Sequence, residues 1–178
     1  MKAEPGFTLI EVATALTVAS VLTMVALPAF SAVLARSRAA EARTALAATL
    51  LDAVRHAGNS GSEVVVCPSR DASTCDDSWD WSQGWIAFAD PDRNRARGGS
   101  EAVLRAERAL SPRTRLISTP GRRKMVFQPS GGNAGSNITF TLCDRRNAVE
   151  PISLVISNAG HLRQATASAL SAQACTSG

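Results

Sequence analysis

The stretch GFTLIEVATALTVASVLTMVALPAFSAVLA, residues 6–35, decides the fold of this 178-residue chain. From Phe7 onward it contains a single formal charge, at Glu11. A helix of this length, at about 1.5 Å per residue, spans the roughly 30 Å hydrocarbon core of a bilayer. The sequence therefore predicts a membrane-spanning helix. Two residues are unusual for a simple anchor: Glu11 lies one turn inside the apolar run, and Pro28 interrupts it near its far end.

Glu11 is the more informative of the two. A carboxylate inside a membrane helix costs about 2.5–3.5 kcal/mol, so such a residue generally has a partner. If the chain is cut after Gly6, Phe7 has a free α-amine one helical turn before Glu11, and the amine of a neighbouring copy can pair with the carboxylate. The alternative is a Glu that is tolerated near the membrane surface. The sequence alone favours neither interpretation.

The segment GFTLIE, residues 6–11, follows a short leader containing Lys2 and resembles the processing site of type IV pilins and type II secretion pseudopilins. The resemblance implies that a prepilin peptidase cuts between Gly6 and Phe7 and methylates the Phe7 amine. It also implies that Pro28 lets the helix loosen on assembly. The helix is then first an anchor in the bacterial inner membrane and later the buried core of a filament of pilins or pseudopilins.

The helix is predicted to continue as RSRAAEARTALAATLLDAVR, residues 36–55, which is rich in the good helix formers Ala, Leu and Arg. Gly58 is the expected stop, so that the helix ends near Ala57. An apolar stripe predicts that this half is amphipathic and packs on the domain that follows. The stripe consists of Leu46, Leu50 and Val54, widened by Leu51.

Beyond the helix, short β-rich runs alternate with turn residues and predict an antiparallel β-domain. We expect a leader at residues 1–6, a transmembrane half-helix at 7–35, an amphipathic half-helix at 36–57 and the β-domain at 58–178. The fold class is α+β, and the segment from Ala165 is predicted to be a small, polar tail. The expected strands are Glu63–Cys67, Gly84–Ala89, Ala102–Glu107, Thr114–Ser118, Lys124–Gln128, Asn137–Cys143, Ile152–Ser157 and His161–Gln164.

Four cysteines lie at positions 67, 75, 143 and 175. An even number in a domain exported to an oxidising compartment favours two disulfides. Of the three possible pairings we favour Cys67–Cys75, which closes a short loop, together with Cys143–Cys175, which fastens the tail to the domain. A zinc site is the rival interpretation, but the cysteine spacing does not match one.

The middle of the chain resembles the GspH/FimT branch of these proteins. The segments that carry this resemblance are CPSRD at residues 67–71, Cys75, and DWSQGWIAF at residues 80–88 followed by Asp90. Trp85 and Ala87 alternate with Ile86 and Phe88, which predicts a central strand with apolar side chains on both faces. Trp79 and Trp81 are interpreted as core or loop-anchoring residues, with nucleic-acid stacking as the alternative.

The sequence DPDRN at residues 90–94, with Glu101 eleven residues after Asp90, imitates the spacing of a calcium loop. Arg95 occupies the position that needs Gly, and the neighbouring arginines would repel a cation. We therefore interpret the segment as a polar hairpin loop and predict no metal and no cofactor. The two histidines, His56 and His161, are far apart, and no nucleophile elbow or phosphate-binding loop occurs, so we predict that the chain is not an enzyme.

Positive charge is concentrated in the last third of the chain. From Arg113 to the C-terminus, eight Lys and Arg face two acidic residues. This excess suggests an anionic partner such as double-stranded DNA. FimT-like DNA binders have a Gly-Arg-x-Arg element, and residues 160–163, Gly-His-Leu-Arg, match it except for His161. The candidate DNA-binding residues are Arg113, Arg115, Arg122, Arg123, Lys124, Arg145, Arg146, His161 and Arg163.

Two functions therefore compete. The first is a minor pilin of a type IV pilus with a DNA-binding face, and the second is a GspH-type pseudopilin of type II secretion with no nucleic-acid role. In both, the resemblance implies a single-pass inner-membrane protein whose C-terminal domain lies in the periplasm. The basic residues favour the pilus, whereas a solvated basic surface, or one that pairs with an adjacent subunit, remains the alternative.

Overall fold

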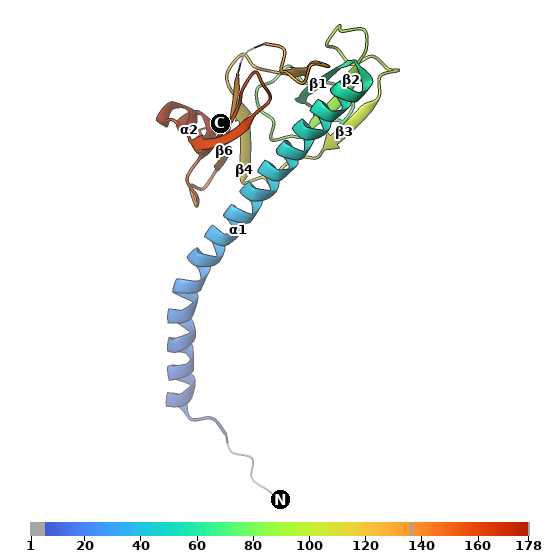
Figure 1. Cartoon of the computed structure of the whole chain (residues 1–178). Helices are drawn as coiled ribbons and strands as arrows, with labels where there is room; N and C mark the ends of the chain where they lie inside the picture. Colours follow the sequence, from blue (N-terminus) through green and yellow to red (C-terminus); the bar gives the residue numbers. More distant parts are fainter. Residues whose placement is uncertain (1–5, 136, 178) are drawn as a thin grey trace, which may run out of the picture. The chain divides into compact units, whose positions relative to one another are not determined.

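The structure, a computed structural model, describes residues 6–135 and 137–177. The chain divides after Leu34 into two units. Helix α1, Leu9–Ser60, belongs to both and continues through Pro28 (Figure 1). Of the leader predicted at residues 1–6, all but Gly6 lies outside the described residues.

The second part of α1 has one buried face, which begins at Ala35. As expected, Leu46 and Leu50 are buried and Val54 is partly buried. Leu51 is half exposed, because it is turned about 100° from Leu50 around the helix, so its predicted place in the stripe is wrong. The face is completed by small residues and one polar residue, which let the sheets approach closely: Ala42, Thr49, Ala53 and Ala57.

The helix ends three residues later than predicted. Gly58 is helical, and Gly61 supplies the left-handed turn with a φ of 70°. The Gly61 N–H donates to the carbonyl of Ala57 at 3.1 Å, which is a glycine C-cap. Both glycines fit the stop signal, and only the positive φ identifies which of them ends the helix.

Eight strands follow within the described residues, and their bounds differ from the predicted ones by at most two residues. They form two antiparallel four-stranded sheets, with orders β3-β2-β1-β5 and β4-β6-β7-β8 (Figure 1). The fold is therefore α+β, a long apolar N-terminal helix packed on antiparallel sheets. The strands are β1 Glu63–Pro68, β2 Trp85–Asp90, β3 Val103–Glu107, β4 Thr114–Ser118, β5 Met125–Phe127, β6 Ile138–Asp144, β7 Ile152–Ile156 and β8 Leu162–Thr166.

The main core joins the buried face of α1 to both sheets. Trp85 and Ala87 of β2 point into this core, whereas Ile86 and Phe88 belong to a second apolar cluster on the other side of the sheet. This confirms that β2 is a central strand buried on both faces. The indole N–H of Trp85 donates to the Thr49 hydroxyl at 3.0 Å, which satisfies both buried polar groups between strand and helix.

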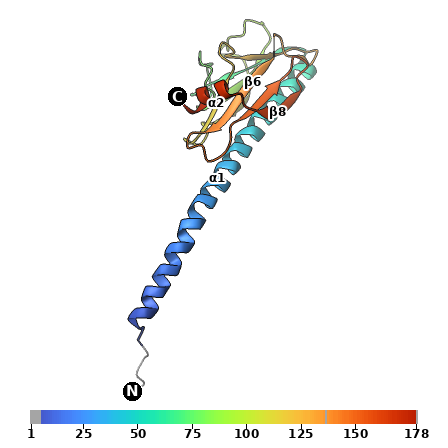
Figure 2. The same ribbon diagram turned by 90° about the vertical axis from the view of Figure 1, so that its left-hand side faces the viewer.

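The small, polar tail contains a helix that the sequence analysis did not predict. It forms helix α2, Ala169–Thr176, whose N-cap Ser168 accepts a hydrogen bond from the Ser171 N–H. Helix α2 lies on β6, and β8 lies beside α1, where Arg43 donates to the Gln164 side chain at 2.7 Å (Figure 2). The two expected disulfides are present: Cys67–Cys75 closes a loop after β1, and Cys143–Cys175 joins β6 to α2.

Candidate assembly and DNA-binding sites

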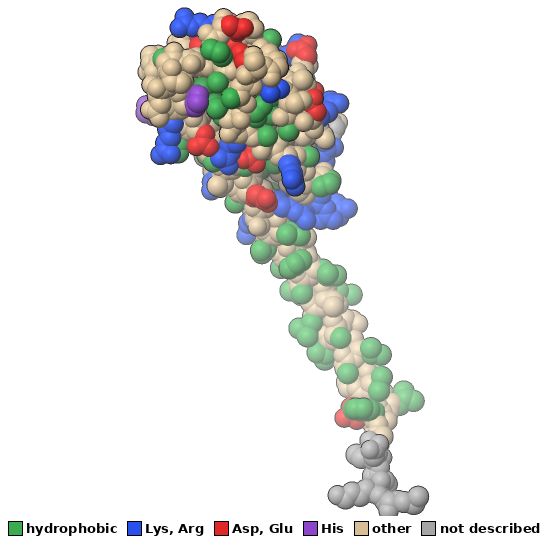
Figure 3. All heavy atoms as spheres, turned by 90° about the vertical axis from the view of Figure 1, so that its right-hand side faces the viewer, with side chains coloured by type: hydrophobic (Ala, Val, Ile, Leu, Met, Phe, Trp, Pro, Cys, Tyr) green, Lys and Arg blue, Asp and Glu red, His purple; other side chains and the backbone are tan. Residues whose placement is uncertain are grey.

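The first part of α1 presents apolar side chains to its surroundings on all sides. Exposed fractions range from 48% at Val12 to 88% at Leu9 among its large apolar residues up to Val33. Hydrophobic side chains accordingly cover the surface of this part of the helix (Figure 3). Within the described residues, α1 is the one helix long and apolar enough to cross a membrane. Apolar surface of this extent favours either a lipid environment or the helices of other subunits.

Glu11 lies at the start of this apolar part and is exposed. It forms a local N-terminal cap with Thr8: the Glu11 N–H donates to the Thr8 hydroxyl at 3.4 Å, and that hydroxyl lies 3.5 Å from the Glu11 carboxylate. The spacing Thr-x-x-Glu is that of a capping box, a signal that our reading of the sequence missed. The carboxylate thus has a structural role within its own chain, beside the predicted pairing with a neighbour.

Gly6 and Phe7 precede the helix and are exposed, so the predicted cleavage point lies in accessible chain. Pro28 lies inside α1 and has no N–H to donate to the carbonyl four residues earlier. The Ser31 hydroxyl donates to the Pro28 carbonyl at 2.8 Å on this part of the helix. The roles predicted for these residues in processing and assembly remain predictions.

The structure does not gather the basic residues into one face. Because β4 and β6 are antiparallel, with Thr114 opposite Asp144 and Ser118 opposite Phe140, their flanking residues divide between the two ends of the sheet. These ends are about 13–20 Å apart along the strands. One end holds Arg113, Arg145 and Arg146, whereas the other holds Arg122, Arg123, Lys124, His161 and Arg163. On the face drawn in Figure 3, Lys and Arg side chains are likewise dispersed, with acidic side chains among them.

Arg115 is a structural residue, and its predicted DNA contact must be corrected. Its side chain is buried. The guanidinium donates to the Asp80 carboxylate at 3.0 Å and to the carbonyls of Ala174 and Cys175 at the end of α2. It also lies over the Trp79 ring, 6.0 Å from its centroid. A cation is favourable at a helix C-terminus, where it complements unpaired carbonyls. Arg115 therefore holds α2 and has no exposed charge for a phosphate.

The cations at the Arg122 end differ in their availability. Arg123 pairs with Asp77, and the Lys124 ammonium donates to the Arg95 carbonyl at 2.8 Å. Arg122 and Arg163 are exposed and form no ion pair within residues 6–135 and 137–177. Arg163 lies on the edge strand β8, one residue after Leu162 and opposite Val155. These two guanidiniums are the strongest candidates for an anion.

The tryptophans are anchors, as the sequence had favoured. Trp81 is fully buried and meets Phe140 edge-to-face, with ring centroids 4.9 Å apart. Trp79 is partly buried against the cluster formed by Ile117 and the Cys143–Cys175 disulfide. A fully buried ring cannot stack on a base, so Trp81 is excluded as a nucleic-acid platform.

One group of three carboxylates, among the residues that the structure describes, is close enough to hold a metal ion. It consists of Asp90, Asp92 and Glu101, the three acids whose spacing imitates a calcium loop. The sequence supplied the spacing, but the conformation of the intervening loop was needed to bring the three side chains together.

The model of the family described as "Type II transport protein GspH" matches residues 42–160. The chain belongs to the GspH family. Two solved structures are similar in fold to this chain: the type IV minor pilin FimU of Pseudomonas aeruginosa and the minor pseudopilin EpsH of the Vibrio cholerae type II secretion system. FimU is 19% identical with a TM-score of 0.51, over 73% of this chain and 91% of FimU. EpsH is 14% identical with a TM-score of 0.52, over 72% of this chain and 97% of EpsH.

No curated protein matches the sequence. Membership of the GspH family makes this chain a minor pilin or pseudopilin, a structural subunit that assembles with other pilins. The family and the apolar helix together indicate a membrane-anchored filament subunit. The FimU and EpsH likenesses, at identities this low, speak for the fold alone.

Proposed function

We propose that the chain is cut between Gly6 and Phe7 and enters a type IV pilus-type filament through the first part of α1. The observation that carries this proposal is an apolar helix surface with one carboxylate, Glu11, at its start. Lipid covers such a surface before assembly, and the same surface of other subunits covers it afterwards. The new Phe7 amine of one subunit offsets the buried charge of Glu11 in the next.

Mass spectrometry of the N-terminal peptide tests the processing step. The full chain is expressed with and without a prepilin peptidase, and the membrane fraction is digested. With the peptidase, we expect a peptide that begins at N-methylated Phe7, and without it the peptide keeps its leader. A protein that retains Met1 in the presence of an active peptidase would contradict the proposal.

We further propose that the folded unit lies in the periplasm. The support is chemical: disulfides persist in oxidising compartments, and the structure pairs all four cysteines. Thiol labelling of intact cells measures this. Cysteines that react with a membrane-permeant maleimide without prior reduction would place the unit in the cytoplasm.

We propose the type IV pilus as the system, with the Arg122 end of the sheet as a DNA contact. Arg122 and Arg163 supply exposed guanidiniums there, and Arg123 and Lys124 add charge once their local contacts exchange for phosphate. The exposed His161 lies at the same end of the sheet. Guanidinium groups bind phosphate oxygens in a bidentate manner.

A gel-shift titration of the full chain in detergent, with double-stranded DNA at several salt concentrations, tests this contact. The triple variant Arg122→Ala, Arg123→Ala, Arg163→Ala is expected to weaken binding and to reduce the slope of log affinity against log salt by about 3. The matched control removes three arginines at the other end: Arg113→Ala, Arg145→Ala, Arg146→Ala. Equal losses in both variants would mean that net charge alone acts, and no binding at low salt would remove the DNA role.

A GspH-type pseudopilin of type II secretion is the second candidate. It is favoured by the division of the basic residues between two ends and by His161 in place of an arginine. Deletion of the gene separates the two functions. Loss of DNA uptake and pilus-dependent motility with normal protein secretion supports the pilus, and accumulation of exoproteins in the periplasm supports the pseudopilin.

A further inference from the structure

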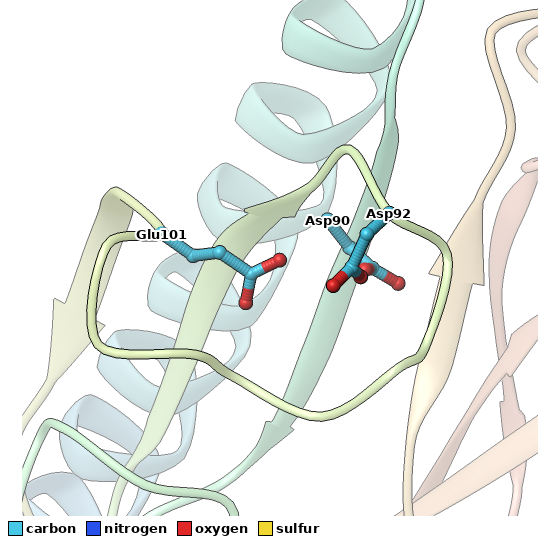
Figure 4. A group of neighbouring side chains, drawn as sticks. All are labelled: Asp90, Asp92 and Glu101. Carbon is cyan, nitrogen blue, oxygen red and sulfur yellow. The ribbon is translucent and has the colours of Figure 1, made fainter.

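The loop between β2 and β3, residues 91–102, brings three carboxylates to one point. Asp90 is the last residue of β2, Asp92 lies two residues further, and Glu101 returns just before β3. Their nearest oxygens all lie within 4.8 Å of one another. Figure 4 shows the Asp90 and Asp92 carboxylates side by side, with Glu101 directed toward them from the other side of the loop.

Two of these carboxylates are buried, and each has one oxygen without a hydrogen-bond partner. Asp90 is fully buried: its Oδ2 accepts from the Arg95 N–H at 2.9 Å, and its Oδ1 has no partner. Glu101 is 9% exposed: its Oε2 accepts from the Gly98 N–H at 2.6 Å, and its Oε1 has no partner. Buried carboxylate oxygens are costly without a donor or a cation, and three like charges this close raise that cost. The unsatisfied oxygens therefore point to a site for a positively charged ligand.

The neighbouring arginines do not supply that charge. The Arg95 guanidinium is 3.7 Å from Glu63, whose backbone lies opposite Asp90 in the sheet, and Arg97 donates to the carbonyls of Ser73 and Glu101. Arg93 is exposed. In the part of the chain that the structure describes, no guanidinium lies within 4.0 Å of the Asp90, Asp92 or Glu101 carboxylates. These arginines therefore repel a cation between the three carboxylates less than the sequence predicts.

The backbone also meets the other objection raised by the sequence. Arg95 adopts a φ of 59° at the sixth loop position, where calcium loops place Gly to make the sharp turn. The turn is thus made in spite of the larger residue. Counting from Asp90, the three acids occupy positions 1, 3 and 12, which are carboxylate-ligand positions of a twelve-residue calcium loop.

We propose that Asp90, Asp92 and Glu101 form a calcium site that fastens the β2–β3 loop. An all-oxygen set of carboxylates suits a hard cation, and a twelve-residue loop with these ligand positions suits calcium better than magnesium, which demands a small octahedral cage. The ion coordinates the oxygens of Asp90 and Glu101 that have no hydrogen-bond donor. The site is independent of the filament and DNA proposals, because its three ligands lie on one loop of one chain.

Thermal unfolding of the full chain in detergent tests the site. The protein is treated with EDTA, dialysed, and melted with 10 mM CaCl2, 10 mM MgCl2 or NaCl of equal ionic strength. For an affinity of roughly 0.1 mM, we expect calcium to raise the melting temperature by about 5–10 °C and magnesium by less than half of that. Equilibrium dialysis with radioactive calcium should give about one bound ion per chain.

Two variants connect the effect to the loop. Asp92→Asn removes an exposed ligand without disturbing the core, and Glu101→Gln removes a buried one; each should weaken calcium binding about tenfold or more. Glu41→Gln is the matched control, because it removes the same charge from an exposed position on α1 and should keep the full shift. No bound calcium in dialysis, an equal shift with magnesium, or a full shift in Asp92→Asn would overturn the proposal.

Discussion

The two parts of helix α1 differ in the exposure of their apolar side chains. Up to Val33 the large apolar side chains are exposed, whereas from Ala35 onward the face formed around Leu46 and Leu50 is buried against both sheets. The buried face is narrow and rich in alanine, and the exposed part is apolar all round. A helix with one apolar stripe can bury that stripe against its own chain, whereas a helix that is apolar on all sides needs lipid or other subunits to cover it. The same continuous element therefore contributes to folding at one end and to assembly at the other.

The largest expected effect separates these two contributions directly. Leu46→Ala should lower the free energy of unfolding by about 2–5 kcal/mol, because it leaves a cavity where the side chain is fully buried. Leu22→Ala, at a site that is 64% exposed, should change it by less than about 0.5 kcal/mol. Chemical denaturation of the full chain in detergent measures both. Similar losses in the two variants would mean that the first part of α1 also contributes to the stability of the folded unit.

The next effect concerns a charged residue of the folded unit, Asp80. In the folded unit, burial acts to raise the pKa of Asp80, but hydrogen bonds from Ser82 and Arg115 outweigh it and lower the pKa below its usual range. A lowered pKa stabilises the folded state at neutral pH, and this stability is lost as the pH falls through the folded pKa. Asp80→Asn should therefore cost about 1–3 kcal/mol at pH 7.

The pH dependence supplies the check on this pair. The difference in stability between wild type and Asp80→Asn should shrink as the pH is lowered from 7 toward 3, measured by denaturation at each pH. Asp77→Asn is the matched control, because its pair with Arg123 is exposed and should be worth less than about 1 kcal/mol. A constant difference across the pH range would show that the Asp80 charge does not matter.

The smallest expected effect tests Glu11, the acidic residue of the exposed part of α1. Glu11→Gln keeps the capping box with Thr8 but removes the charge, whereas Glu11→Ala removes both. If the carboxylate pairs with the Phe7 amine of a neighbour, both variants should enter filaments about tenfold less than wild type, a difference of about 1.4 kcal/mol. Immunoblotting of sheared filaments against membranes measures the ratio. Normal incorporation of Glu11→Gln would leave Glu11 with a capping role only.

Strand positions could be predicted because their signal is local. Short β-rich runs between turn residues located the strands, and apolar residues on both faces identified β2 as central. Sheet order could not be predicted, because it depends on pairings between residues far apart in the sequence. The grouping of the basic residues has the same cause, because the β4–β6 register, which places Arg145 and Arg146 at the Arg113 end, is invisible in the sequence.

The remaining misses arose where two local signals competed. Gly58 and Gly61 both look like helix stops, and Ser168 before a run of small residues looks as much like a tail as like the N-cap of α2. Arg115 resembled its neighbours in charge, yet the end of α2 buries it. In the loop that starts at Asp90, the spacing was visible, but the course of each arginine side chain was not.

Helix α2 is fastened twice, by the bond between Cys143 and Cys175 and by the Arg115 guanidinium at its last turn. The second attachment needs no oxidant. A newly made chain can thus place its tail on β4 and β6 while all four sulfurs are still reduced, which brings the Cys175 thiol next to Cys143. Mispairing with Cys67 or Cys75 would first require the tail to leave that seat, so the fidelity of oxidative folding depends on an arginine as well as on the cysteines.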